Sequence, residues 1–336
     1  MLTIGWIGCG THANEMLLPQ VTRAGMRIAA LCDINTDTLA RTAQRFGISD
    51  TTTDWRDVLR RSNIQAIGIA AGPAAHCEIG LAAVEAGLPV FIEKPPAPTA
   101  ALAAKLAAAA EVRGVPVVPG FMKRYSTANR IAANVIRSEE FGPVASFLGQ
   151  YMTAPTYFAK DVDYTGFYLH HCVHYFDLVP HLMGQPVEIG ARRHELAPGK
   201  LLLHVDVRFH SGAIATLVMG THQSRGTPME WWQVMGDHRR VEVRNIHEVR
   251  YFRAPKFKVD DLAASLVEGE DTMVWEPNFT VAANEDHKGY LALLREFAAA
   301  AAGQPNTAPT ARDGARAMAL LETMIRAAET GDRIAV

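Results

Sequence analysis

The stretch Gly8-Cys9-Gly10-Thr11-His12-Ala13 follows an apolar, strand-like run and opens a helical segment, in the pattern G-x-G-x-x-A. In such a turn the first glycine permits a tight bend, the second lets the backbone approach a pyrophosphate, and the small third residue lets helix and strand pack closely. The helix N-terminus attracts the phosphate charge. The stretch therefore predicts a dinucleotide-binding turn, whose expected contact residues are Gly8, Gly10, Thr11, His12 and Ala13.

A carboxylate at the end of the second expected strand selects among dinucleotides. Asp33 lies about twenty residues beyond the turn, where a carboxylate accepts hydrogen bonds from the adenosine ribose and repels a 2′-phosphate. Ile34 and Asn35 follow, with no arginine to receive that phosphate. The sequence therefore predicts NAD in preference to NADP. The structural alternative is that Asp33 caps the next helix.

Short apolar runs alternate with helical patterns over the first 120 residues. Strands are expected at 3–7, 27–32, 66–70, 90–92 and 115–118, and helices at 36–46, 74–86 and 97–110. This alternation favours right-handed crossovers and a parallel sheet covered by helices on both faces. We therefore expect an α/β Rossmann domain, with a doubly wound parallel sheet, over residues 1–122.

After about residue 126 the alternation of single strands and helices gives way to runs of consecutive strands. Helices are expected at 126–138, 167–183, 289–302 and 311–330, and strands at 144–151, 201–209, 213–219, 230–235 and 240–243. Consecutive strands with short turns between them favour antiparallel pairing. Residues 123–336 are therefore expected to form an α+β substrate-binding and oligomerisation domain with an open, mainly antiparallel sheet. Within one strand, Trp231 and Trp232 should face opposite sides of that sheet.

The composition excludes several classes of partner. Lys and Arg number 33 against 35 Asp and Glu, so there is no basic surplus for nucleic acid. No apolar run reaches the roughly 18–20 residues of a membrane span, and no signal-like segment opens the chain. The four cysteines are scattered and form no C-x-x-C pair. We expect a reduced, cytoplasmic protein that binds neither membrane nor nucleic acid.

Glu93-Lys94-Pro95, placed after the fourth expected strand and behind the glycine turn, resembles the signature of the glucose–fructose oxidoreductase/inositol dehydrogenase/rhizopine-catabolism (Gfo/Idh/MocA) family. The resemblance covers nearly the whole chain. It extends to Pro73-Ala74-Ala75-His76, although Ala71-Gly72 replaces the usual threonine before the proline, and to Gly120-Phe121-Met122-Lys123-Arg124-Tyr125, His174-Tyr175-Phe176-Asp177 and the last helix.

The resemblance implies hydride transfer between NAD(P) and a hydroxyl or keto group of a sugar, cyclitol or related polyol. It also implies a homodimer or homotetramer formed through the C-terminal sheet. By position, Lys94 contacts the reacting oxygen, His174 exchanges its proton, and Glu93 lies near the nicotinamide end. The further residues that it implies are Pro73, His76 and Lys94 for the cofactor, and Lys94, Arg124, His170, His174 and Asp177 for the substrate.

One position departs from the family. The residue four before His174 is usually aspartate, and here it is His170. We expect His170 to bind a substrate hydroxyl, or to accept the proton itself. At helical spacing His170, His174 and Asp177 share one face, which also suits zinc or histidines satisfied by backbone carbonyls. Because no HExxH motif is present and the resemblance explains His174 and Asp177, no metal is predicted.

Three functions fit these patterns. The first is a sugar or cyclitol dehydrogenase. The second is an NAD-dependent glycosidase that oxidises its sugar transiently, so that the glycosidic group leaves by elimination. The third is a non-catalytic sensor of dinucleotide. The presence of both Lys94 and His174 favours the dehydrogenase over the sensor.

Overall fold

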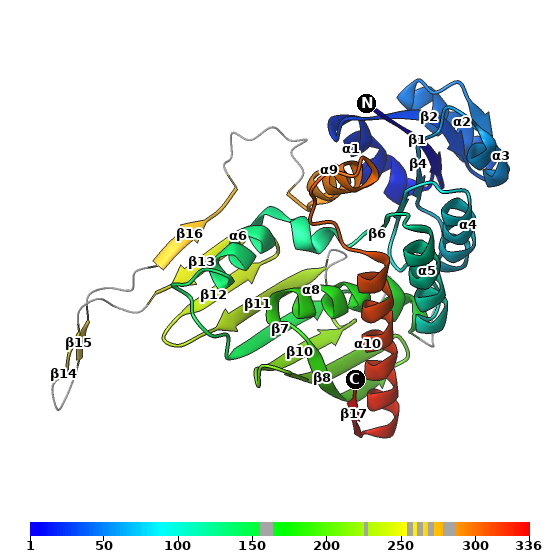
Figure 1. Cartoon of the computed structure of the whole chain (residues 1–336). Helices are drawn as coiled ribbons and strands as arrows, with labels where there is room; N and C mark the ends of the chain where they lie inside the picture. The colour runs from blue at the N-terminus through cyan, green and yellow to red at the C-terminus, as the bar shows by residue number, and fades with distance from the viewer. Residues whose placement is uncertain (155–163, 225–227, 254–257, 261–264, 268–271, 278–286) are drawn as a thin grey trace. The chain divides into compact units, whose positions relative to one another are not determined.

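The computed structural model describes residues 1–154, 164–224, 228–253, 258–260, 265–267, 272–277 and 287–336 (Figure 1). The chain forms two compact units. The first comprises Met1–Tyr125, Leu169–Asp177 and Gly289–Glu322, and the second comprises Ser126–Tyr168, Leu178–Lys288 and Thr323–Val336. The first unit thus includes two segments that come later in the chain.

The first unit is built on a six-stranded parallel sheet. Its strands are β1 (Leu2–Ile7), β2 (Met26–Cys32), β3 (Thr51–Thr52), β4 (Ala66–Ile69), β5 (Val90–Ile92) and β6 (Val117–Pro119). They lie in the order β3-β2-β1-β4-β5-β6, and every neighbouring pair is parallel. The order reverses between β1 and β4, and ligands of such sheets bind outside the carboxyl ends of the strands at that point. The expected doubly wound Rossmann domain is confirmed.

The helices of this unit begin and end as their capping residues predict. Asn35 accepts a hydrogen bond from the Thr38 amide at the start of α2 (Thr36–Phe46), which ends at Gly47 with φ 67°. Thr99 and Gly114 cap α5 (Ala100–Arg113) in the same way. The remaining helices near the sheet are α1 (Leu18–Arg23), α3 (Trp55–Arg60) and α4 (Pro73–Glu85).

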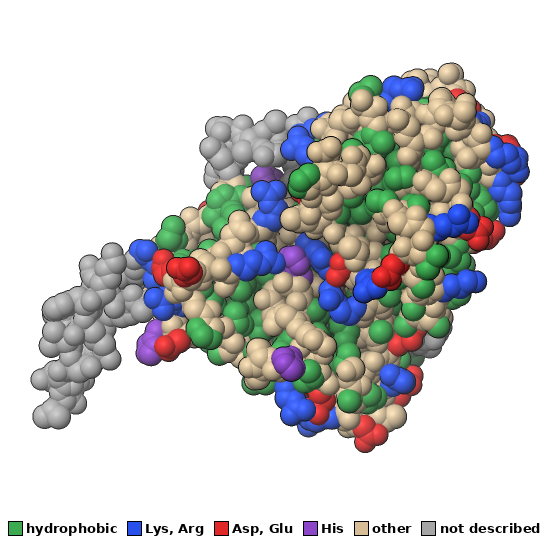
Figure 2. Space-filling model, viewed as in Figure 1, with side chains coloured by type: hydrophobic (Ala, Val, Ile, Leu, Met, Phe, Trp, Pro, Cys, Tyr) green, Lys and Arg blue, Asp and Glu red, His purple; other side chains and the backbone are tan. Residues whose placement is uncertain are grey.

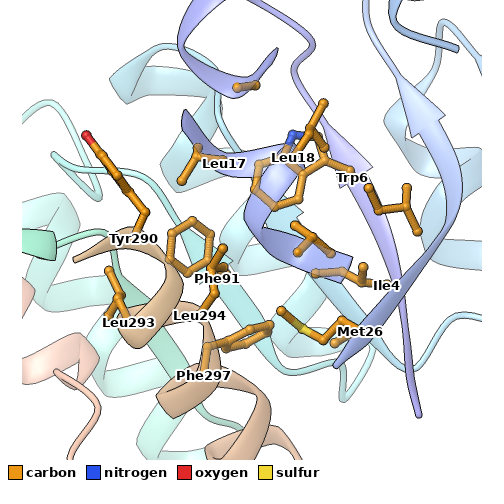
Figure 3. Close-up of a cluster of buried hydrophobic side chains, with 14 of the residues drawn as sticks. Ile4, Trp6, Leu17, Leu18, Met26, Phe91, Tyr290, Leu293, Leu294 and Phe297 are labelled. Atoms are coloured by element: carbon orange, nitrogen blue, oxygen red, sulfur yellow. The ribbon is translucent and has the colours of Figure 1, made fainter. Parts of the chain in front are cut away.

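A late helix completes the core of the first unit (Figure 3). Helix α9 (Tyr290–Ala301) turns its apolar side chains toward the sheet, and the Phe297 ring lies 5.9 Å from that of Phe91 in β5. The Trp6 ring of β1 also stacks on Phe91, and the centroids of these two rings are 6.1 Å apart. The buried cluster includes Ile4, Trp6, Leu17, Leu18, Met26, Phe91, Tyr290, Leu293, Leu294 and Phe297.

The second unit contains a nine-stranded, mainly antiparallel sheet, as expected. Its order is β16-β13-β12-β11-β7-β10-β9-β8-β17, and among these pairs β7 and β10 run parallel. The bounds are β7 Ser146–Met152, β8 Pro186–Ala197, β9 Lys200–Phe209, β10 Ile214–Gly220, β11 Met229–Met235, β12 Arg240–Arg244, β13 Glu248–Phe252, β16 Thr272–Trp275 and β17 Arg333–Ala335. A separate pair joins β14 (Lys258–Asp260) to β15 (Ser265–Val267).

Alternation along β11 places its two tryptophans as expected. Trp232 is buried, stacks on Phe147 with ring centroids 5.7 Å apart, and donates its indole N–H to the Asn129 side-chain oxygen at 3.2 Å. Trp231 lies on the other face and is partly exposed. Asn129 belongs to α6 (Thr127–Ile136), which packs against β12 and β13. The sheet is thus covered on one face by a helix.

The helices that complete the chain are α7 (Thr165–Phe167), the π-helical turn η4 (Tyr168–Cys172), α8 (Val173–Met183) and α10 (Ala311–Thr330). On the face drawn in Figure 2, acidic and basic side chains are interspersed among the described residues. No helix in the described part of the chain is both long and apolar enough to cross a membrane.

Candidate active site

The glycine turn closes against β4 on one side and is open on the other. Gly8 has a φ of 96°, which L side chains rarely adopt, and a Cβ there would lie 2.2 Å from the carbonyl oxygen of Ala70. At Gly10 a Cβ would meet no described atom within 4 Å. The first glycine is therefore required by the bend, and the second leaves room for a pyrophosphate, as the pattern predicts.

Asn14 holds this turn in place, although the sequence gave it no role. Its Nδ2 donates to the carbonyl oxygen of Cys9 at 2.6 Å and to Oγ1 of Thr42 in α2 at 2.9 Å. Asn14 lies in the π-helical turn η1 (Ala13–Leu17) that precedes α1. Asparagine is disfavoured inside a helix, so its presence at position 14 is the feature of the sequence that could have pointed to this role.

Asp33 is oriented toward the glycine turn. Its Oδ2 accepts a hydrogen bond from the Cys9 amide at 2.6 Å, and its Oδ1 accepts one from the Asn35 amide at 2.8 Å. Asn35, and not Asp33, caps α2. Each carboxylate oxygen has a second lone pair that can accept from a ribose hydroxyl. The next side chain, Ile34, is 89% exposed. The turn and its carboxylate thus fit a dinucleotide.

His76 joins the ends of two strands through its ring. In α4, which begins at Pro73, the Nε2 of His76 accepts from the Ala71 amide at 2.9 Å, so Nδ1 donates to the Pro95 carbonyl oxygen at 2.8 Å. Burial lowers the pKa of His76 and favours this neutral form. Because both ring nitrogens bind backbone, His76 shapes the loops after β4 and β5.

Glu93 is buried directly after β5. Its Oε2 accepts a hydrogen bond from the Lys94 amide at 3.0 Å, and its Oε1 lies 3.6 Å from Nε2 of His12. Gly120 makes room for it, since a Cβ there would lie 2.7 Å from Oε1. Burial works to raise the pKa of Glu93, but His12 and Lys94 hold the pKa below its ordinary value. Glu93 is therefore a buried anion beside the glycine turn.

Lys94 reaches across to a helical segment that comes much later in the sequence. Its Nζ donates to the backbone carbonyl oxygen of His170 at 2.9 Å. Burial lowers the pKa of Lys94, the carboxylate of Glu93 opposes that effect, and Lys123 adds to it. The ammonium is thus fixed in direction and keeps two further N–H donors.

The helical segment that receives Lys94 changes its winding at the site. Tyr168–Cys172 form a π-helical turn, and α8 begins at Val173. The prediction of a common face for His170, His174 and Asp177 assumed regular α-helical spacing, which this wider turn interrupts. The side chain of His170 is exposed, whereas His171 and His174 are buried. Nothing in the sequence indicated a role for His171.

The buried histidines are neutral at ordinary pH. Burial lowers the pKa of His174 well below its usual value, and Lys94 and Lys123 lower it further. Burial and, to a lesser degree, the charge of Lys94 lower the pKa of His171 to about 3. Among the described residues Nδ1 of His174 is buried and has no hydrogen-bond partner. An unprotonated imidazole with an open acceptor position can take a proton from a bound hydroxyl.

Arg124 and Asp177 bind each other. Nε and Nη2 of Arg124 donate to the two oxygens of Asp177 at 2.8 and 2.5 Å, and Nη2 also lies 3.4 Å from Asp313. Burial disfavours the charged guanidinium, but the two carboxylates raise the pKa of Arg124 above its ordinary value. The pair anchors the start of α8 to the segment after β6. Among the described residues, no three His, Cys, Asp or Glu side chains are grouped as metal ligands.

Two family models together match most of the chain. Residues 2–121 match the model of an oxidoreductase family with an NAD-binding Rossmann fold, and residues 133–336 match the C-terminal alpha/beta domain of that oxidoreductase family. The inositol 2-dehydrogenase of Gluconacetobacter diazotrophicus is 39% identical over 133 residues, which are 38% of each chain. The levoglucosan dehydrogenase of Pseudarthrobacter phenanthrenivorans is 30% identical over 36% of this chain and 31% of its own. Each alignment spans less than half of the relative.

Solved structures share the fold over its whole length. A dehydrogenase from Chromobacterium violaceum has a TM-score of 0.86 and 21% identity, with coverage of 98% of this chain and 96% of that one. Levoglucosan dehydrogenase in complex with NADH and levoglucosan has a TM-score of 0.84 and 19% identity, with coverage of 100% and 99%. At these identities the similarity concerns the fold.

Replacing Arg124 with glutamine should destabilise the protein, because it leaves the buried carboxylate of Asp177 without its guanidinium. Removing one partner of a buried pair costs about 3–5 kcal/mol, which guanidinium unfolding can measure. The matched control is Arg60→Gln, which removes an exposed pair with Asp57 and should change the free energy of unfolding by less than about 1 kcal/mol. Equal stabilities, with only a raised Michaelis constant in Arg124→Gln, would show that Arg124 binds substrate.

Proposed function

Because the chain belongs to the glucose–fructose oxidoreductase/inositol dehydrogenase (Gfo/Idh/MocA) family of NAD-binding oxidoreductases, we propose that it transfers hydride between NAD and a hydroxyl or keto group of a sugar, cyclitol or related polyol. The observation that carries the proposal is the ammonium of Lys94, fixed on the carbonyl oxygen of His170 four residues before the buried, neutral imidazole of His174. In alcohol oxidation a neutral base can take the hydroxyl proton, and an ammonium can stabilise the negative charge that develops on the oxygen.

The residues that would hold the dinucleotide lie at the carboxyl ends of β1 and β2. The turn at Gly8 and Gly10 would receive the pyrophosphate, and the carboxylate of Asp33 would accept from the adenosine ribose. When bound, NAD supplies the hydride acceptor. Glu93 and His12, which lie together beside the same turn, are proposed to face the nicotinamide half.

Lys94 is proposed to bind the oxygen that reacts. One N–H of its ammonium is directed to the His170 carbonyl, which leaves two donors for the substrate. Negative charge grows on the substrate oxygen as the hydride leaves its carbon. A positive group fixed beside that oxygen therefore binds the transition state more strongly than the ground state.

His174 is proposed to take the hydroxyl proton. Its lowered pKa keeps the imidazole unprotonated over the whole neutral range, and no described residue hydrogen-bonds its Nδ1. His170 contributes its backbone carbonyl to Lys94, and we propose that its exposed side chain positions a neighbouring hydroxyl. Arg124 and Asp177 support the site by anchoring α8.

An open face of the second unit supports the proposed homodimer or homotetramer. Ser146 of β7 is paired with both Ile214 and Met235, so these apolar side chains share one face with Leu148. Ile214 is 58% exposed, Met235 is 39% exposed and Leu148 is 38% exposed. Apolar patches of this kind commonly mark interfaces. The free, buried cysteines support the proposed cytoplasmic location.

A panel of sugars, inositols and keto-sugars with NAD(H), followed at the absorbance band of reduced nicotinamide, tests the proposed activity. Net reduction of NAD by a polyol supports it. Release of a glycosidic leaving group without net NADH would instead favour the glycosidase, and dinucleotide binding without turnover of any compound would favour the sensor.

NAD should bind more tightly than NADP, because Asp33 faces the position of a 2′-phosphate. Replacing Asp33 with serine and Ile34 with arginine should shift the preference toward NADP, since the change removes an anion and adds a cation. Nicotinamide fluorescence gives the dissociation constants of NADH and NADPH for both proteins. Tighter binding of NADPH by the unmodified protein would contradict the ribose assignment.

Lys94→Ala should lower turnover by a factor of about 10²–10³, the typical effect of removing one donor to a developing oxyanion, with little change in NADH affinity. Lys105→Ala, on the exposed surface of α5, is the matched control and should keep full turnover. Near-normal turnover of Lys94→Ala would remove Lys94 from the chemistry.

His174→Ala should reduce turnover by about 10²–10⁴. Because the pKa of His174 is lowered, its neutral form persists in acid, and the rise of rate with pH should be complete below pH 6.5 in the unmodified protein. That rise should vanish in His174→Ala. His170→Ala should raise the Michaelis constant and keep the profile. If the pH dependence disappears only in His170→Ala, the two roles are exchanged.

A further inference from the structure

One oxygen of the buried Glu93 carboxylate has an open place for a donor. Oε2 accepts a hydrogen bond from the Lys94 amide, whereas Oε1 is buried and has no hydrogen-bond partner in the part of the chain that the structure describes. Glu93 is only 4% exposed, and a Cβ at Gly120 would lie 2.7 Å from Oε1. Leaving a buried carboxylate oxygen without a donor costs free energy. Glu93 is therefore set up to accept one more hydrogen bond.

His12 is placed to supply that donor. Its Nε2 lies 3.6 Å from Oε1 of Glu93, slightly longer than a hydrogen bond. The imidazole makes an edge-to-face contact with the ring of Tyr290 in α9, with centroids 5.6 Å apart, and this contact limits the directions that the imidazole can take. These three residues all belong to the first unit. A small movement of the imidazole would therefore complete a hydrogen bond to Glu93.

The same histidine belongs to the glycine turn. It lies two residues after Gly10, which leaves room for a pyrophosphate, and its side chain is 45% exposed. His12 thus forms part of the proposed diphosphate site and also borders the buried carboxylate of Glu93.

The segments around this turn carry acids but no lysine or arginine. Residues 8–22, 28–40 and 70–93 include the loops after β1, β2 and β4, and neither residue type occurs in them. Asp33 accepts a hydrogen bond from the turn, and Glu93 is a buried anion beside it. His76 stays neutral because both its ring nitrogens bind backbone groups. A bound diphosphate would add negative charge, which favours a proton on the imidazole of His12.

We propose that His12 takes up a proton when the dinucleotide binds, donates a hydrogen bond from Nε2 to Oε1 of Glu93, and serves as the cation of the diphosphate site. The proposal rests on the proposed function and adds to it a proton-linked cofactor-binding residue. The proton comes from solvent and returns to solvent when the dinucleotide leaves. An imidazolium beside a carboxylate and a diphosphate is stabilised by both, and its charge-assisted hydrogen bond is stronger than that of a neutral ring.

The linkage gives the affinity for the dinucleotide a definite dependence on pH. Because the complex holds the proton more tightly than the free protein, binding is strongest in acid and weakens as the pH rises through the titration of His12 in the complex. Imidazole is the side chain that ordinarily titrates near neutral pH. His174, whose pKa His12 also lowers, is already neutral there. The other charged or titratable groups around His12 are Glu93, Lys94, Tyr290, Asp33 and Glu15.

The test measures binding, so it does not depend on turnover. Calorimetric titration with NADH in buffers of different ionisation enthalpy counts the protons that the complex takes up. We expect net uptake at neutral pH, and a dissociation constant that rises with pH by up to about tenfold per unit, the limit for one proton. ADP-ribose, which contains the diphosphate but no nicotinamide, should show the same uptake.

His12→Gln keeps an N–H donor for Glu93 but cannot become a cation. It should abolish the uptake, weaken NADH binding most in acid and leave the dissociation constant independent of pH. The matched control is His238→Gln in the second unit, which removes an exposed imidazole 2.7 Å from the carboxylate of Asp237 and should leave the uptake unchanged. NMR of the His12 ring in the unmodified protein gives a second measurement, because saturation with ADP-ribose at neutral pH should move its signals toward the imidazolium position.

Binding of NADH without proton uptake, or the same uptake in His12→Gln, would overturn the proposal. So would uptake with NADH but not with ADP-ribose, since the diphosphate would then not be its cause, or His12 signals that stay in place on saturation. Failure of the proposed function gives a different result. In that case NADH and ADP-ribose bind with uptake of a proton that depends on His12, but no polyol reduces NAD.

Discussion

The hydrogen bond from Nζ of Lys94 to the carbonyl oxygen of His170 is the contact on which the site depends. It joins the loop after β5 to a π-helical turn that comes much later in the chain. It fixes the direction of the ammonium and holds it beside the segment that carries His174. In the proposed mechanism this contact positions the ammonium at the oxygen that reacts, which the dinucleotide-binding turn after β1 does not do.

Several side chains near that contact form hydrogen bonds to other groups of the protein and so support it. His76 binds two backbone groups and so shapes the loop that carries Lys94. Arg124 and Asp177 bind each other and anchor α8. These three residues match family motifs that suggest ligand contact, and here their hydrogen bonds hold the framework. Among the groups that we propose to face ligands are the ammonium of Lys94, the imidazole of His174 and the carboxylate of Asp33.

The sequence predicted most of the first unit because its signals are local. Asn35 and Gly47 cap α2, and Gly8 serves the bend that its pattern implies. Features set by distant contacts have no local signal: α9 packs in the first unit, and no strand was expected at β8. The π-helical turn at Tyr168–Cys172 and the different exposure of His170 and His174 have no local sequence pattern that marks them.

The most direct measurement follows a deuterium label from the carbon of a polyol. Sugars, cyclitols and sugar acids deuterated at their carbinol carbons would be incubated with the protein and NAD, and the reduced nicotinamide analysed by NMR. We expect deuterium at C4 of the nicotinamide, on one face of the ring, because hydride passes directly between the two carbons. Retention of the label in every polyol, or its loss to water while no label enters the cofactor, would contradict hydride transfer at this site.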